Sequence, residues 1–119
     1  GYLKWRTDLY KFHADTCGEL MAQAGYDEAD IERAKKAVGK KAIKSNPDTQ
    51  LLEDVVDLVF IEHYMLEFAG KHPEYDEAKW IDIIQKTWRK MSETGQQFAL
   101  SGKITLPEPL VPLIQKALA

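Results

Sequence analysis

The chain has 119 residues, of which 45% are hydrophobic and 29% are charged, and its formal net charge at pH 7 is −3. This length and balance are typical of one globular domain that buries a hydrophobic core. The acidic balance argues against nucleic-acid binding, and no apolar run is long enough to span a membrane. We therefore expect a single domain over residues 1–119 that is part of a longer chain, binds no nucleic acid and contains no membrane span.

Cys17 is the only cysteine, so no disulfide can form within the chain. This composition is typical of a reducing compartment, and no signal peptide opens the sequence. We expect an intracellular location, in the cytoplasm or inside an organelle. The sequence begins with Gly1 rather than methionine, which indicates a processed product or a piece of a longer chain.

Two helices are predicted in the first third of the chain. The first runs over residues 2–24 and ends at Gly25, a residue suited to the left-handed conformation that closes a helix. Its large side chains repeat every three or four residues and predict the face that contacts the core: Trp5, Leu9, Phe12, Thr16 and Leu20. The second helix follows its N-cap Asp27 and ends near Gly39. The lysine-rich stretch over residues 33–44 is interpreted as a solvated helix face.

The third predicted helix, over residues 47–69, is the most apolar. Asn46 is its expected N-cap, and Pro47 is suited to the first helical position. The stretch LLEDVVDLVFIEHYMLEFA is apolar nearly all round. A helix of this kind belongs in the centre of a fold, so we expect the other helices to surround it and to cover Val56, Val59 and Phe60.

The fourth predicted helix begins after Asp76 and ends near Gly102, with Gly95 inside it as a point of close packing. Its apolar stripe consists of Trp80, Ile81, Ile84, Trp88 and Met91. An extended segment and a short terminal helix follow in LPEPLVPLIQKALA. Because no strand signal appears, we predict an all-α fold, a compact bundle of four main helices and a short C-terminal helix.

Two ionisable side chains are predicted to lie on apolar helix faces. At 100° per residue, His13 falls within about 40° of Leu9, and Asp54 shares a face with Leu58 and Ile61. A carboxylate in this position is costly unless it is paired, hydrogen-bonded or bound to a metal. We favour a buried polar pair, or separate hydrogen bonds to the backbone. The alternative is part of a metal site, since histidine and aspartate are both ordinary ligands.

Several stretches resemble known families. The order of His13, a turn at Gly25 and Asp54 on a later long helix resembles the second half of a domain of the HD superfamily, the all-helical fold of metal-dependent phosphohydrolases. The stretches YLKWRTDLYKFHADTCGELMAQAGYDEADIER, LEDVVDLVFIEHYMLEFA and IDIIQKTWRKMSETG resemble the uncharacterised domain-of-unknown-function 4202 family over essentially the whole chain. The resemblance implies an HD-like bundle and carries over His13 and Asp54 as candidate metal ligands.

The sequence departs from the HD pattern at two points. It contains no His-Asp dipeptide, and Lys40 and Lys41 stand where a further metal-binding histidine would end the second helix. A lysine ammonium repels a cation. We therefore expect an HD-like domain with a degenerate metal site and no bound cofactor.

Such a domain would act as a structural or protein-interaction module, and its partner would be another protein or another part of the same chain. One alternative is a metal-dependent phosphohydrolase that acts on a nucleotide or another phosphate ester. Its divalent-metal site would then be completed by residues outside this chain. Another alternative is a small-molecule binding domain that uses a pocket at His13 and Asp54. Whether the protein is an enzyme stays open at this point.

Overall fold

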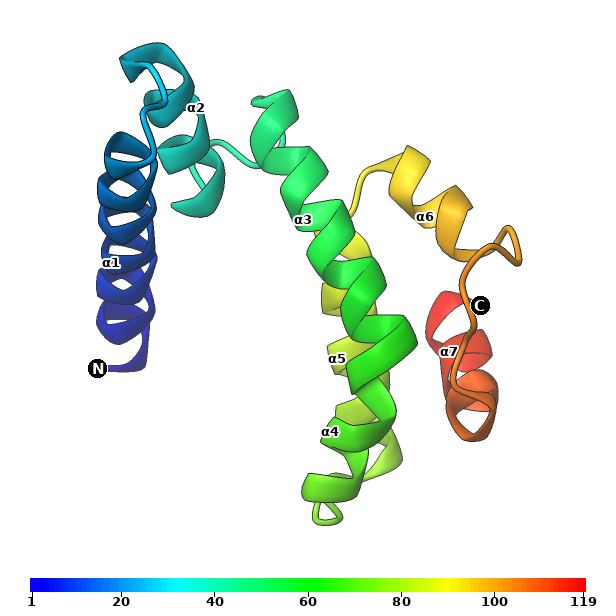
Figure 1. The fold of residues 1–119 in the computed structure, drawn as a ribbon. Coiled ribbons are helices and arrows are strands. Elements are labelled where there is room, and N and C mark those ends of the chain that lie inside the picture. The colour runs from blue at the N-terminus through cyan, green and yellow to red at the C-terminus, as the bar shows by residue number, and fades with distance from the viewer. The chain divides into compact units, whose positions relative to one another are not determined.

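The computed structural model describes residues 1–119, and every regular element in it is helical (Figure 1). The predicted all-α class is therefore confirmed. No helix is both long enough and apolar enough to cross a membrane. Contacts divide the chain into two compact units, Gly1–Glu53 and Asp54–Ala119. A single compact HD-like bundle stays a prediction.

The first unit contains two helices that lie side by side, α1 (Tyr2–Gln23) and α2 (Glu28–Val38) (Figure 1). The chain leaves α1 at the predicted residue, because Gly25 has a φ of +90° and closes a Schellman turn. Asp27 caps α2 as expected, and its side chain accepts a hydrogen bond of 2.8 Å from the N–H of Asp30. Local capping therefore fixes the ends of both helices where they meet.

The face of α1 that packs within this unit is not the predicted one. The buried residues of α1 are Ala14 and Gly18, whereas Trp5, Phe12 and Leu20 are 59%, 62% and 60% exposed. At 100° per residue the two faces lie about 170° apart, on opposite sides of the helix. The expected core face of this helix is therefore wrong, because α2 packs against the small side chains, which permit a close approach of the two backbones.

A sharp turn follows α2. Gly39 is the last residue before the turn, and the next residue, Lys40, has a φ of +56°. The N–H of Lys40 donates to the carbonyl of Ala37, and the N–H of Lys41 donates to the carbonyl of Lys36. The turn is therefore a Schellman motif in which a lysine takes the left-handed position that glycine usually occupies.

The predicted long apolar helix is present as three consecutive segments. They are α3 (Pro47–Val59), the π-helical segment η1 (Phe60–Tyr64) and α4 (Met65–Lys71). The side chain of Asn46 caps the start as predicted and accepts a 3.0 Å hydrogen bond from the N–H of Asp48. The extent of the helical run is thus confirmed, with one π-helical turn inside it.

The helices of the second unit do not surround this helical run. Val55, Val56 and Val59 are 47%, 47% and 39% exposed, whereas Ile61 and Met65 are buried. The expected cover of Val56 and Val59 is wrong within the second unit, because its helices bury only one stripe of the run, whereas Phe60 is half-buried and packs against the core.

The core of the second unit lies where this run meets α5 (Glu77–Lys90) and α7 (Val111–Leu118). Asp76 caps α5 as predicted and accepts a 2.8 Å hydrogen bond from the N–H of Lys79. A short 3-10 turn, η2 (Glu108–Leu110), leads into the predicted C-terminal helix. The largest buried core residues are Ile61, Met65, Trp80, Ile84, Met91, Leu110 and Ile114.

The predicted fourth helix is broken into two. After α5 ends, Met91 is extended, and a separate helix, α6 (Glu93–Ala99), begins with Ser92 as its N-cap. The Oγ of Ser92 accepts a 3.1 Å hydrogen bond from the N–H of Gly95. A single helix to Gly102 is therefore wrong, because Ser92 supplies a new start signal. Gly95 lies inside a helix as predicted.

Candidate functional site

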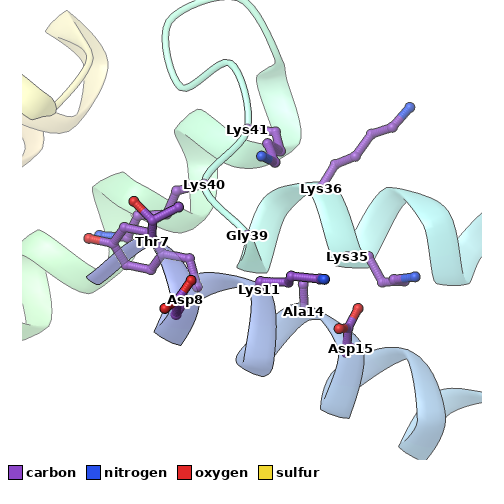
Figure 2. Close-up of a pocket in the computed structure, with 11 residues that line it drawn as sticks. Thr7, Asp8, Lys11, Ala14, Asp15, Lys35, Lys36, Gly39, Lys40 and Lys41 are labelled. Carbon is purple, nitrogen blue, oxygen red and sulfur yellow. The ribbon is translucent and has the colours of Figure 1, made fainter. Parts of the chain in front are cut away.

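A cavity of about 510 Å³ lies between α1, α2 and the turn that follows α2 (Figure 2). Its volume is within the range of small-molecule pockets. Asp8 and Asp15 are its acidic lining residues. Five basic residues line the same cavity: Lys11, Lys35, Lys36, Lys40 and Lys41. Five lysines against two aspartates leave three formal positive charges in excess.

Small residues bring the two walls of the cavity together. A Cβ added at Gly18 would lie 2.9 Å from the Cδ of Lys35, and one added at Gly39 would lie 3.5 Å from the Cβ of Ala14. The aliphatic stem of Lys35 therefore rests on the backbone of α1, which leaves its ammonium group toward solvent. The Lys35 Nζ lies 3.8 Å from a carboxylate oxygen of Glu32.

A buried carboxylate holds Lys40 in its left-handed conformation. The Lys40 Nζ lies 3.3 Å from the Oε2 of Glu53, whose side chain is only 2% exposed. The same ammonium lies 5.2 Å from the centroid of the Tyr10 ring. A non-glycine residue in this conformation costs roughly 1–2 kcal/mol. The contact with Glu53 offsets that strain and fixes the turn at the edge of the cavity.

The remaining charges of the cavity are only partly neutralised. Lys11, Lys36 and Lys41 form no ion pair in the structure, and Asp15 forms none either. Asp8 forms an ion pair with Lys4, which does not line the cavity, and its carboxylate lies 2.7 Å from the Nζ of Lys4. The cavity therefore has the charge of an anion-binding site, with three lysines that have no acidic partner.

The outer face of α1, on the side away from α2, is apolar and exposed. Tyr2 is 67% exposed, and its ring stacks on Trp5 with 6.0 Å between the centroids. His13 lies at the edge of this face and is exposed, with its ring centroid 5.9 Å from that of Phe12. The histidine predicted to face a core is thus placed on an exposed apolar surface.

Asp54 is buried and hydrogen-bonded, as predicted. It is 8% exposed, and its two carboxylate oxygens accept hydrogen bonds from the N–H and the Oγ of Ser92 at 2.8 and 2.5 Å. The carboxylate therefore supports the start of α6. His13 belongs to the first unit and Asp54 to the second, and their direct pairing stays a prediction.

The side chains near Asp54 do not form a ligand set for a divalent metal. No group of three or more histidine, cysteine, aspartate or glutamate side chains in the chain could hold a metal ion. Glu62 accepts a hydrogen bond from the N–H of Thr105 and pairs with His63 at 2.9 Å.

The lysine-lined cavity is the site that the sequence interpretation missed. The sequence predicts a solvated face for the lysines of α2 and the following turn, and Lys36 and Lys41 are exposed, but it does not show that they also line a cavity. The missed signal is Ala14 followed four residues later by Gly18, since two small residues at this spacing form a flat helix surface for close packing. That contact turns a solvated lysine face into one wall of a cavity.

The fold and these sites define an all-helical protein with a basic cavity in its first unit. The chain matches the family model described as Domain of unknown function (DUF4202) over residues 1–114. Because the match covers nearly the whole chain, the protein belongs to this family. No curated protein and no solved structure matches the chain.

Proposed function

We propose that this chain is a helical protein-interaction module whose contact surface is the outer face of α1. The observation that carries the proposal is the exposure of large apolar side chains on one helix face. Trp5, Phe12 and Leu20 are each about 60% exposed. Contiguous apolar surface of this kind marks interaction sites on folded proteins.

The first unit also lacks large apolar side chains in its interior. Ala14 is its only buried hydrophobic residue, although the unit contains 53 residues (Gly1–Glu53). A unit of this size is marginally stable even with a normal core. A partner that covers the outer face of α1 would supply the missing apolar burial and would stabilise the helix pair.

The partner in this proposal is a second copy of α1. Tyr2, Trp5, Leu9, Phe12 and Thr16 follow one another at alternating intervals of three and four residues. This is the spacing of the seam between two helices that pack along their length. An identical seam is complementary to it, and a two-fold axis relating two copies closes such an assembly.

The proposal includes an HD-like origin in which His13 and Asp54 are remnants of a metal site. The engagement of both Asp54 oxygens by Ser92 supports a structural role for this carboxylate. Elemental analysis of the purified protein tests this part. One equivalent of a transition metal that is lost in His13→Ala would favour the phosphohydrolase alternative instead.

The pairing of His13 with Asp54 is tested by a double-mutant cycle. If the two side chains form a buried couple, the alanine variants should show a coupling energy of roughly 0.5–3 kcal/mol in urea unfolding. Additive effects would leave Ser92 as the partner of Asp54 and would remove His13 from the site.

Sedimentation velocity tests the interaction surface directly. The unmodified chain should sediment as a dimer, and Phe12→Glu should sediment as a monomer because a carboxylate cannot be buried in the seam without a partner. Leu100→Glu is the matched control, since Leu100 is 60% exposed and belongs to the second unit. An unmodified chain that stays monomeric, or a dimer that Phe12→Glu leaves intact, would contradict the proposal.

A further inference from the structure

We propose that the lysine-lined cavity of the first unit binds an organic phosphate, and that Lys11, Lys36 and Lys41 contact the phosphate oxygens. The inference is independent of the proposed α1 contact, since the cavity lies on the α2 side of that helix. It assigns a ligand class to a cavity that both helices build.

The positive charge of the cavity lining favours an anionic ligand. Lys11, Lys36 and Lys41 line the same cavity without an acidic partner, and the repulsion between like charges on one cavity raises the free energy of the empty site. A phosphate dianion removes this repulsion, and each ammonium group donates a charge-assisted hydrogen bond to it. Asp15 carries the opposing charge, because it lines the cavity without an ion pair of its own.

The dimensions and lining of the cavity select an organic ligand over a bare ion. A volume of about 510 Å³ is many times that of a phosphate ion, which is comparable to a few water molecules of about 30 Å³ each. Ala14 and the ring of Tyr10 add apolar surface to the lining. The phosphate end of the ligand would lie among the lysines, and its carbon skeleton would lie against this surface.

Hydrogen bonds of the turn fix the backbone at Lys36, Lys40 and Lys41 before any ligand binds. Lys40 and Lys41 belong to the Schellman turn, and Lys36 provides the carbonyl that accepts the hydrogen bond from the N–H of Lys41. The ion pair between Lys40 and the buried Glu53 fixes the same turn. Because this part of the backbone is already ordered, less backbone entropy is lost when the anion binds.

The test is an NMR titration of the full chain with fructose 1,6-bisphosphate, and separately with inorganic phosphate, at constant ionic strength. We expect saturable shifts of backbone amides over residues 7–15 and 35–41, with tighter binding of the sugar bisphosphate. Lys36→Ala and Lys41→Ala should each weaken binding by about tenfold, the loss expected for one charge-assisted hydrogen bond. Asp15→Asn should strengthen binding, a change of sign that general loss of structure cannot produce.

Lys71→Ala is the control for net charge, because Lys71 is exposed and lies in the second unit. It should leave the affinity unchanged. The proposal is overturned if binding does not saturate, or if Lys71→Ala weakens it as much as Lys36→Ala does. If inorganic phosphate binds with the same affinity as the sugar bisphosphate, the assignment of an organic ligand is wrong. Circular dichroism should show unchanged helix content in the lysine variants, since neither Lys36 nor Lys41 forms an ion pair in the structure.

Discussion

Replacement of Gly95 by alanine should destabilise the protein, although the same change stabilises most helices. Alanine is favoured over glycine by about 1 kcal/mol in a helix interior. At this position, however, the new Cβ would lie 2.8 Å from the Cγ of Asp54 and 3.0 Å from both of its carboxylate oxygens. The buried carboxylate must therefore move away from α6.

The magnitude follows from the hydrogen bonds that this movement breaks. Asp54 accepts two hydrogen bonds from Ser92, and a hydrogen bond to a charged group contributes about 1.5–3 kcal/mol. Loss of one or both, less the gain in helix propensity, gives a net destabilisation of roughly 0.5–5 kcal/mol. The thermal midpoint should fall by about 4–8 °C for each kcal/mol.

Urea unfolding of four proteins checks this reasoning: the unmodified chain, Gly95→Ala, Asp54→Ala and the double variant. Without the carboxylate, Gly95→Ala should become neutral or stabilising. Gly70→Ala is the matched control, because Gly70 lies inside α4 and nothing approaches within 4 Å of its added Cβ. If Gly95→Ala is as stable as Gly70→Ala, the carboxylate does not pack against α6 as described.

Three further outcomes are expected. Lys40→Gly should relieve backbone strain of about 1 kcal/mol. It should nevertheless lower the free energy of unfolding by about 1–2 kcal/mol overall, because the buried Glu53 loses its ion-pair partner. In a Glu53→Gln background the same change should stabilise the protein in urea unfolding. Gly25→Ala should cost roughly 1–2 kcal/mol in the same assay, since its φ of +90° disfavours a side chain. The Arg33 guanidinium, which donates to both carboxylate oxygens of Asp48 at 2.9 and 3.0 Å, holds the pKa of Asp48 below its usual 3.8. The ion pair between Arg33 and Asp48 therefore stabilises the fold above the usual pKa of the carboxyl group, and this stabilisation is lost as the pH falls through the lowered pKa of Asp48. An NMR titration of Arg33→Gln should show the pKa of Asp48 rising, and an unchanged value would refute the pairing.

Much of the local structure could be predicted because its causes lie within a few residues along the chain. The caps Asp27, Asn46 and Asp76 each bind an N–H two or three residues further on. Gly25 ends its helix through its own backbone freedom. The burial of Asp54 was also predictable, because its neighbours at helical spacing include core residues. Its partner Ser92 was not, since it lies 38 positions away.

Which helix faces are buried was decided only by the tertiary structure. α1 carries large apolar residues on one side and Ala14 and Gly18 on the other, and the sequence alone favoured the larger ones. In the first unit α2 packs on the small residues, because close contact of two backbones depends on the shapes of both helices. The same contact creates the lysine-lined cavity. Capping is a local property of the chain, whereas a cavity exists only when two separately encoded surfaces meet.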